Sequence, residues 1–354
     1  MKFNLIFGGV VAAIAGLAFV VLTFERLPVD STQGGFRGTS MGRVDNPRTV
    51  AALAVRNQAP PASEAADDSG PRASEIYENV QVLGHLSIEQ FGRIMLAMSE
   101  WIYPNAENPA ESCNGCHVPG NFAAEGMYQK TVARRMLQMV QTINSTYSSH
   151  VQQVGVTCYT CHRGQAVPAA VWAEAPPNAR LHRLLSTAPA DNRPVVANAY
   201  SSLPTDAYSA FLTRDSQVGV AGTSARQADN NSSIRQTEWT WSIMMHMSTS
   251  LGVNCTFCHN SRNFSSWQES TPKRVTAWHG LRMVRSINND YIDPLQPEFP
   301  PHRLGPMGDP LKVNCSTCHM GVNQPLLGAP MLRDYPELNP PPRSASLELP
   351  ASRN

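Results

Sequence analysis

Four copies of one short pattern, Cys-x-x-Cys-His, contain the residues of this sequence that are best suited to chemistry. The copies are Cys113-Asn-Gly-Cys116-His117, Cys158-Tyr-Thr-Cys161-His162, Cys255-Thr-Phe-Cys258-His259 and Cys315-Ser-Thr-Cys318-His319. This pattern is the attachment signature of c-type haem, in which two thiols add across the haem vinyl groups and the adjacent His ligates the iron. All eight cysteines belong to the four copies. The sequence therefore predicts four covalently bound c-type haems.

Other uses of paired cysteines explain the pattern less well. A single copy could be half of a zinc site or a redox dithiol. Zinc would need the pairs to combine two by two, and it gives no reason for a His after every second Cys. A disulfide framework would not repeat one spacing four times. Haem attachment accounts for the whole pattern.

Each iron also needs a second axial ligand or an open face for chemistry. Apolar spacing and start signals predict helices over residues 87–101, 131–147, 239–251 and 272–288. The first three helices each precede a motif and carry the methionines Met95, Met98, Met136, Met139, Met244, Met245 and Met247. A Met on an apolar face usually fills core space, but its recurrence before three motifs favours ligation. Met–His ligation raises the haem potential and suits electron transfer.

The two halves of the chain repeat each other. The stretch Arg93-Ile-Met95-Leu-Ala-Met98-Ser99 matches Ser242-Ile-Met244-Met-His-Met247-Ser248, and Met139-Val-Gln-Thr-Ile-Asn144 matches Met283-Val-Arg-Ser-Ile-Asn288. We therefore predict a unit of helix and haem motif, used twice, with that pair duplicated. The first haem-pair unit covers residues 86–165, and the second covers residues 233–325.

The fourth motif departs from this repeat. In register, Met136 corresponds to Gly280, and Met139 corresponds to Met283. If Met136 ligates the second haem, the fourth haem has lost its Met, and His150 is free to replace it. The competing histidines are His85, His182, His246, His279 and His302. If Met139 and Met283 are the ligands instead, His150 has no such role, and the repeat leaves both assignments open.

The segments outside the two units are predicted from their composition. Residues 1–27 contain the uncharged run Leu5–Phe24, which is long enough to span a bilayer and lacks a cleavage site, so we expect a retained transmembrane anchor. Residues 28–85 are expected to be an extended tether that can contact a partner. Residues 166–232 form a connector, and residues 326–354 form a Pro-rich, irregular tail. The 28 prolines predict a mainly α fold with much irregular structure.

Charge gives a weaker signal. The 28 basic and 27 acidic residues nearly balance, so nucleic acid is not an expected partner. Between residues 61 and 111 only Arg72 and Arg93 oppose nine acids, namely Glu64, Asp67, Asp68, Glu75, Glu78, Glu89, Glu100, Glu107 and Glu111. We read this stretch as a landing patch for a basic partner near the first haem. Three arginines on the 272–288 helix, Arg274, Arg282 and Arg285, form either an exposed basic face or contacts to haem propionates.

The chain resembles the tetrahaem cytochrome c subunit bound to photosynthetic reaction centres of purple bacteria. The resemblance runs from Gln33-Gly-Gly-Phe-Arg-Gly38 to Asp334-Tyr-Pro-Glu-Leu338. Its more specific blocks are Ala133-Arg-Arg-Met136, Gly155-Val-Thr-Cys-Tyr-Thr-Cys-His-Arg-Gly164, Asn254-Cys-Thr-Phe-Cys-His-Asn260 and Gly280-Leu-Arg-Met-Val-Arg285. The resemblance implies that Met95, Met136 and Met244 are the second axial ligands of the first three haems. It implies that His150 plays this role for the fourth haem.

The resemblance also implies a function. Electrons would arrive from a soluble periplasmic donor, either a basic cytochrome c or a high-potential iron–sulfur protein, and would reach the photo-oxidised bacteriochlorophyll pair. The haems would form a roughly linear row of alternating potential, with the third nearest the pigments. Reaction-centre core subunits are the implied partners, with a light-harvesting complex as a further candidate. The chain would be an electron carrier rather than an enzyme, anchored in the inner photosynthetic membrane with its bulk in the periplasm.

Two other classes share some of these features. A membrane-anchored tetrahaem quinol dehydrogenase has the anchor and the haem count, but such proteins are much shorter and lack the duplicated Met-bearing helix. A multihaem reductase needs an iron with an open face. Quinol-dependent reduction without a reaction centre would identify the first, and rapid binding of carbon monoxide or nitrite would identify the second. Some members of the resembled family carry a lipid-modified Cys, and this sequence has none to spare, so its anchor is expected to be the helix itself.

Overall fold

The computed structural model describes residues 2–24, 27–35, 38, 41–105, 107–176, 192–219 and 234–341. Within these ranges the chain is mainly helical, with long irregular connections and a single small sheet, as the composition predicted. Several predictions fall wholly or partly outside the described residues. They include His182, the middle of the block Gln33–Gly38, parts of the connector 166–232, and the end of the tail after residue 341.

The four helices predicted to carry ligands are present. They are α4 (Ile88–Ile102), α6 (Tyr128–Thr146), α10 (Ile234–Leu251) and α11 (Pro272–Ser286). Ser87 caps α4, because its side chain accepts a hydrogen bond from the Gln90 backbone while the Gln90 side chain bonds back to Ser87. Pro272 stands in the first turn of α11, where its missing N–H costs nothing.

Helix α1 (Lys2–Thr23) is longer than these four and stands apart at the N-terminus. The other helices are shorter: α2 (Pro47–Arg56), α3 (Ala73–Ile76), α5 (Pro109–Ser112), α7 (Ser148–Val151) and α13 (Met331–Asp334). Single turns or π segments cover Val196–Asn198, Ser209–Thr213, Ile287–Ile292, Asp293–Glu298, Pro301–Arg303, Pro325–Gly328 and Pro336–Leu338. Strands β1 (Asp30–Gln33) and β2 (Gly42–Asp45) pair in antiparallel register. These pieces connect the four longer helices rather than forming layers of their own.

The haem motifs adopt two local shapes. The second and fourth are short α-helices, α8 (Cys158–His162) and α12 (Cys315–His319), each ended by a left-handed residue, Arg163 or Met320. The first and third begin as 3-10 turns, Cys113–Gly115 and Cys255–Phe257. The first motif is therefore like the third, and the second is like the fourth. This is the relation that a duplicated pair of units would produce, and the two-unit organisation as a whole stays our proposal.

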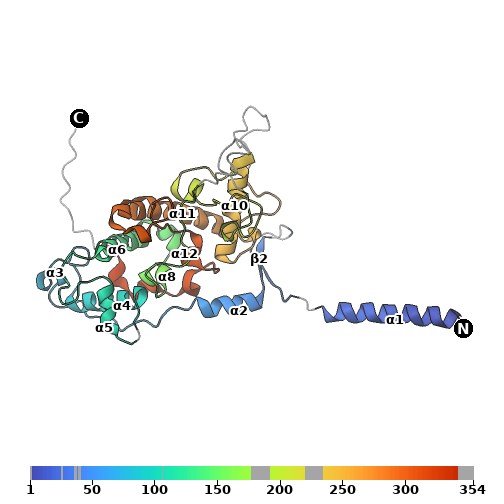
Figure 1. The fold of residues 1–354 in the computed structure, drawn as a ribbon, viewed down its shortest axis with the longest axis horizontal. Coiled ribbons are helices and arrows are strands. Elements are labelled where there is room, and N and C mark those ends of the chain that lie inside the picture. The colour runs from blue at the N-terminus through green and yellow to red at the C-terminus, as the bar shows by residue number, and fades with distance from the viewer. Residues whose placement is uncertain are drawn as a thin grey trace, which may run out of the picture.

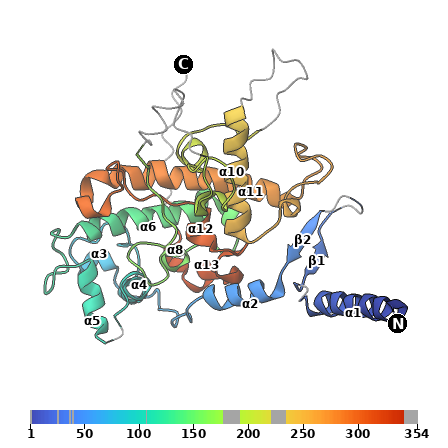
Figure 2. The same cartoon turned by 45° about the vertical axis from the view of Figure 1, so that its right-hand side comes forward.

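Helix α1 is the one described helix that is long and apolar enough to cross a membrane. Its window Ile6–Thr23 has a mean hydropathy of 2.5 and none of it is buried against the rest of the chain. In both views the β1–β2 hairpin lies between α1 and the helical body (Figures 1 and 2). A retained anchor and an N-terminal signal sequence share these properties.

Residues 28–85, expected to be an extended tether, contact the body at several points. The Val44 backbone N–H donates to Asn254 Oδ1 at 2.9 Å, and Asn254 Nδ2 donates to the Gly42 carbonyl at 2.9 Å. These bonds hold the hairpin against the third motif, which begins at Cys255. Asn57, at the end of α2, is fully buried, and its Nδ2 donates to the Leu53 carbonyl. The segment therefore lies along the body, and its limits as a domain remain a prediction.

Hydrophobic packing reaches into two segments that looked irregular in the sequence. One core cluster packs α4 and α6 together and includes Leu338, which is fully buried. The other joins Ile243 of α10 to Phe211 and Leu212 from the predicted connector. The expectation of an irregular tail is wrong for its described part, because α13 and the turn Pro336–Leu338 pack inside. Elements of three to five residues are too short to show apolar periodicity, so the sequence pattern could not reveal them.

A buried ion pair fastens the tail to the first long helix. Arg93 of α4 donates Nη1 to both carboxylate oxygens of Glu337, at 2.7 and 2.8 Å. Its side chain is 6% exposed and that of Glu337 is 2% exposed. The guanidinium also donates to the carbonyls of Ser63, Glu64 and Asp334 and lies 4.3 Å from the centre of the Tyr335 ring. One side chain therefore joins the N-terminal segment, α4 and the tail.

Replacing Arg93 by Met should destabilise the protein strongly, because Glu337 would stay buried without a partner. Breaking one side of such a pair costs about 3–5 kcal/mol in the free energy of unfolding. Thermal unfolding followed by circular dichroism would measure the loss. The control is Arg72→Met, which breaks an exposed pair with Asp68 and should cost at most about 1 kcal/mol. Equal effects of the two substitutions would contradict the assigned role.

Candidate functional site

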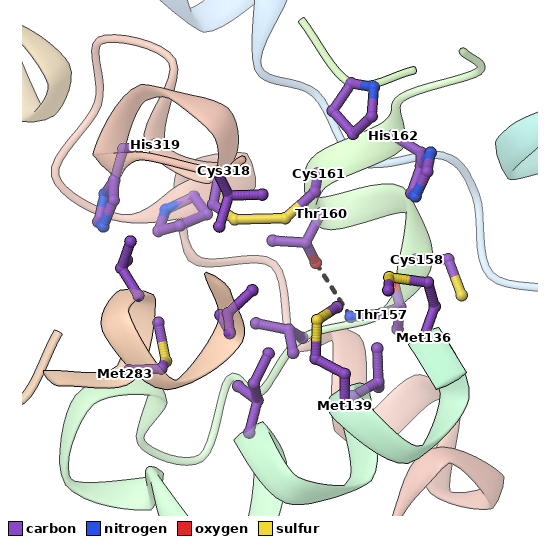
Figure 3. A pocket seen from close by; sticks show the side chains of 18 of the residues that line it. Met136, Met139, Thr157, Cys158, Thr160, Cys161, His162, Met283, Cys318 and His319 are labelled. Carbon is purple, nitrogen blue, oxygen red and sulfur yellow. Dashed lines mark hydrogen bonds between the residues drawn. A yellow bond between two sulfur atoms is a disulfide. The ribbon is translucent and has the colours of Figure 1, made fainter. Parts of the chain in front are cut away.

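A cavity of about 290 Å³ lies at the centre of the helical body, and all four motifs contribute to its wall. The second and fourth motifs contribute all of their Cys and His residues, while the first and third each contribute only their second Cys to this set. The motif cysteines and histidines that line the cavity are Cys116, Cys158, Cys161, His162, Cys258, Cys315, Cys318 and His319. Figure 3 shows α8 and α12 lying next to each other at this cavity, with the sulfurs of Cys161 and Cys318 bonded between them. Motif residues that are up to 203 positions apart in the sequence, from Cys116 to His319, are thus brought together.

The rest of the wall is mainly apolar. Helix α6 supplies Met136, Met139 and Val140, and α11 supplies Met283 and Val284. Such a wall suits a large flat apolar ring better than a polar substrate. The donor set and the wall together fit covalently attached haem: sulfurs for the vinyl groups, imidazoles for the iron, and apolar side chains for the ring faces.

The second and fourth motifs are direct neighbours. Cys161 and Cys318 are joined by a disulfide, with their Cα atoms 4.6 Å apart. Independently of the sulfurs, Arg163 donates Nη2 to the Cys318 carbonyl at 3.0 Å. A sulfur in a disulfide cannot also form a thioether. Haem attachment at these two motifs therefore requires Cys161 and Cys318 as separate thiols.

Four of the remaining motif cysteines are held in the thiol form by their surroundings. Burial raises the pKa of Cys158 and of Cys315 to about 12. Burial also raises the pKa of Cys116 and of Cys258 to about 11. The addition of S–H across a vinyl double bond starts from a thiol and needs no oxidant, so these groups carry the atoms that the attachment consumes.

The four motif histidines share one hydrogen-bonding arrangement. Each ring bonds through Nδ1 to a backbone carbonyl, and because a carbonyl can only accept, Nδ1 carries the proton. The pairs are His117 with Phe122 at 3.0 Å, His162 with Gln165 at 2.8 Å, His259 with Phe264 at 2.9 Å, and His319 with Val322 at 3.0 Å. The acceptor is five residues on in the first and third motifs and three residues on in the second and fourth. This bond fixes the orientation of each ring, and in the neutral ring it leaves Nε2 as the nitrogen that can bind a metal.

His150, the candidate ligand outside the motifs, is held in the same way. Its Nδ1 donates to the Thr276 carbonyl at 2.9 Å. Burial lowers the pKa of His150 and of His162, and burial next to His150 lowers the pKa of His319 to about 4. All three rings are therefore neutral at physiological pH, which is the protonation state that binds iron.

His150 also faces the His of the fourth motif. The two ring centres are 6.0 Å apart, with the ring planes at 70°. A metal–imidazole bond is about 2 Å long, so the separation of the ring centres is close to what two imidazoles sharing one iron would need. Gly280 makes the approach possible, because a Cβ there would lie only 2.4 Å from His150 Cε1. The position at which the repeat expects a Met side chain is thus filled by the ring of His150.

The methionine candidates are placed less uniformly. Met136 and Met139 both line the cavity, near Cys158 and His162 of the second motif (Figure 3). On α4 and α10 it is Met98 and Met247 that line it, whereas Met95 and Met244 are partly buried against the core clusters. The motif histidines His117 and His259 also lie outside this cavity. The structure therefore leaves the choice within each helix open.

The competing histidines have other surroundings. His246 is buried, and its ring lies within hydrogen-bond distance of Tyr208 and Ser250. His279 packs edge-on against Trp278. Neither these two nor His85 and His302 line the central cavity. Among the described histidines outside the motifs, only His150 faces a motif His.

The three arginines of α11 have protein partners. Arg274 donates Nη1 to the Ser266 carbonyl at 2.7 Å and lies over the Trp267 ring. Arg282 lies over the Trp278 ring, and Arg285 donates to the Phe211 carbonyl and pairs with Asp215. Contacts of these groups to haem propionates stay a prediction.

Sequence reasoning missed Arg163 as a contact between motifs. Besides Cys318, Arg163 reaches Asn57 Oδ1 at 2.8 Å and so ties α2 to both central motifs. The one signal in the sequence was its position directly after the motif residue His162. In the structure the backbone of Arg163 is left-handed. Arg163 and Cys318 are 155 positions apart, and a contact between such distant residues leaves no local pattern in the sequence.

Cysteines and carbonyl-anchored histidines arranged around an apolar cavity define a c-type cytochrome. Comparison with known proteins gives the family. The sequence profile described as "Photosynthetic reaction centre cytochrome C subunit" matches residues 25–339. The photosynthetic reaction center cytochrome c subunit of Rubrivivax gelatinosus is 46% identical over 323 residues, covering 91% of this chain and 87% of that protein. The subunit of the same name from Thermochromatium tepidum is 45% identical, covering 92% and 79%.

A third subunit of that name, from Roseobacter denitrificans, is 39% identical and covers 92% of this chain and 90% of its own length. The chain therefore belongs to the family of photosynthetic reaction-centre cytochrome c subunits. It is an electron carrier rather than an enzyme, it binds haem covalently, and it acts in photosynthetic electron transport in association with the reaction centre and the membrane.

Replacing Gly280 by Ala should displace His150, because the new Cβ would overlap its ring. The expected result is a change in the low-spin electron paramagnetic resonance signal of one haem, together with a lower melting temperature. The matched control is Gly92→Ala in α4, where nothing lies within 4 Å of the added atom. That control should stabilise the helix by about 0.5–1 kcal/mol. An unchanged spectrum in Gly280→Ala would refute the contact.

Proposed function

We propose that this chain carries electrons from a soluble periplasmic donor through four covalently bound haems to the photo-oxidised bacteriochlorophyll pair of a reaction centre. The observation that carries the proposal is the set of five neutral or carbonyl-anchored imidazoles, each presenting Nε2, beside the sulfurs of four motifs. Family membership supplies the photosynthetic context. The two pseudo-repeated haem-pair units, 86–165 and 233–325, are part of the same proposal.

The ligand set is proposed residue by residue. The attachment sulfurs are those of Cys113, Cys116, Cys158, Cys161, Cys255, Cys258, Cys315 and Cys318. The motif histidines His117, His162, His259 and His319 bind iron on one side. Met95, Met136, Met244 and His150 bind it on the other. When bound, the haems supply one-electron redox chemistry, with Met–His ligation giving a higher potential than bis-His ligation.

Two protein ligands on every iron would leave no position for a substrate. The role of the chain is then to hold each ring, orient each imidazole and exclude water from the iron. The pair His150–His319 supports this reading for the fourth haem, since both residues line the central cavity and their ring centres are 6.0 Å apart. It also supports a lower potential there than at the neighbouring Met-ligated haems.

The N-terminal segment supports an orientation in the membrane. We propose that α1 is a retained transmembrane anchor and that the rest of the chain is periplasmic. Only residues 24–29 separate α1 from β1, so their ends are at most about 25 Å apart. The hairpin bonds to Asn254, next to the third motif. The third haem is therefore the one we place nearest the membrane, the reaction-centre core and its pigments.

The surface near the first motif supports docking of a basic donor. All nine acids of the stretch 61–111 are exposed. Of the two arginines there, Arg72 pairs with Asp68 and Arg93 is buried against Glu337. The stretch therefore presents a net negative surface to a basic cytochrome c or to a high-potential iron–sulfur protein with a basic face. A light-harvesting complex is a further proposed neighbour.

Reversing Glu64, Asp67 and Asp68 to Lys should slow oxidation of a basic cytochrome c donor by at least about tenfold at low ionic strength, because electrostatic steering would be lost. Flash-induced donor oxidation in membranes is the measurement. High salt should slow the wild type and leave the variant little changed. The control is reversal of Asp290 and Glu298, two acids outside this stretch. A donor rate insensitive to both salt and the triple reversal would rule out electrostatic docking.

Haem content and light response test the proposal as a whole. The mature protein should carry four haem masses, with every Cys-containing peptide modified and no haem-free peptide linking Cys161 to Cys318. Potentiometric titration of haem absorbance should resolve four one-electron steps in a higher and a lower group. A flash should oxidise haem in purified membranes. Four haems without a flash response would instead point to a quinol-linked or reductase function.

A further inference from the structure

Lys130 of α6 is a buried cation that the proposed electron path does not yet explain. The residue is only 7% exposed to solvent. Its Nζ donates to three successive backbone carbonyls, those of Phe122 at 3.0 Å, Ala123 at 2.9 Å and Ala124 at 3.0 Å. In the described part of the chain no ion pair includes Lys130, and the nearby Glu125 pairs with Arg134 instead. Its charge is held by these three carbonyl dipoles, and the Glu125 carboxylate also acts on it electrostatically.

One of these carbonyls is the acceptor for the first motif His. The Phe122 oxygen takes the Nδ1 proton of His117 at 3.0 Å and the Lys130 ammonium at 3.0 Å. A carbonyl oxygen has two lone pairs, so it can hold both donors at once. A charge-assisted bond from the ammonium draws electron density from the oxygen. The oxygen then accepts less strongly from the imidazole, and His117 becomes a weaker electron donor at Nε2.

The other motifs lack this arrangement in the residues that the structure describes. In the register that aligns Met136 with Gly280, Lys130 corresponds to Arg274. Arg274 donates to the carbonyls of Ser265 and Ser266, which are one and two positions past Phe264. Phe264 is the residue whose carbonyl accepts from His259. The acceptors of His162 and His319, Gln165 and Val322, receive no side-chain cation there. The shared carbonyl thus distinguishes the first motif.

We infer that Lys130 is a positioning residue that orients His117 through the Phe122 carbonyl and raises the reduction potential of the first haem. Two effects act in the same direction. A buried positive charge favours the reduced iron, which carries one positive charge less. A weaker imidazole donor also favours the reduced iron. The inference rests on the proposed function in taking His117 as the iron ligand of the first haem.

The test is a redox titration of the full haem-loaded protein carrying Lys130→Met. One of the four components should move to lower potential, with its reduction equilibrium constant changed by about three- to tenfold, and tenfold equals 59 mV for one electron. The other three components should stay in place. Met95→His identifies the component of the first haem, because bis-His ligation lowers the potential of that haem alone.

Two further variants and one spectroscopic check make the outcome specific. Lys130→Arg keeps the positive charge, so the reduction potential of the first haem should stay close to its wild-type value. Arg134→Met removes a charge one turn further along α6, where the side chain bonds Glu125 rather than Phe122, and should move no component as far. Low-spin resonance spectra show whether axial ligation is kept in each variant.

Each result separates the inference from the proposed function. Four wild-type components with an unmoved first haem in Lys130→Met would overturn the role of Lys130 and leave the electron carrier intact. An equal shift in Arg134→Met would show that any nearby positive charge has the same effect on the potential, and it would also overturn the inference. A wild type without a first-motif haem would instead refute the ligand assignment on which both rest. If Lys130→Met fails to accumulate, Lys130→Gln removes the charge while keeping a polar side chain near the three carbonyls, and it should show the same downward shift. An unmoved first haem in that variant would overturn the inference.

Discussion

One hydrogen bond, from an imidazole Nδ1 to a backbone carbonyl, recurs at every His that we propose as an iron ligand. Five rings are held in this way, and each of them is therefore forced to present Nε2. The acceptors are main-chain atoms of turns that directly follow a motif, or of α11 in the case of His150. Because these carbonyls cannot donate, the tautomer is set before any metal binds. The rest of the fold serves to keep those turns in place.

The long helices supply the walls between which the rings are held. Helices α6 and α11 provide the apolar side chains of the cavity, and α4 and α10 carry the methionines that precede the first and third motifs. One difference between the two helices affects the cavity directly. Where α6 has Met136, α11 has Gly280, and the free volume is taken by His150. In the ligand set that we propose, His150 would stand in for the missing Met.

Much of the remaining chain is held against the helical body by polar contacts between distant segments. The β1–β2 hairpin is held at the third motif, Asn57 is buried beside Arg163, and the tail is held by the Arg93–Glu337 pair. A protein rich in proline has few long elements to pack, so its stability depends on such specific polar contacts between distant segments. This explains why segments without periodic apolar patterns nevertheless lie against the body.

The sequence by itself determined the chemistry and the four long helices. Cys-x-x-Cys-His is a contiguous covalent signature, and helix caps and apolar spacing are local patterns, so both could be recognised without knowing the fold. The observed α4, α6, α10 and α11 agree with their predicted ranges, although α10 begins five residues earlier than predicted. Only the tertiary structure decided that His150 faces His319, that the second and fourth motifs adjoin, and that Lys130 shares a carbonyl with His117. These are contacts between a few atoms from separate segments, and packing rather than local preference brings them together. The choice between Met95 and Met98, or Met244 and Met247, depends on side-chain placement around the bound ring, for which helical spacing offers two positions one turn apart.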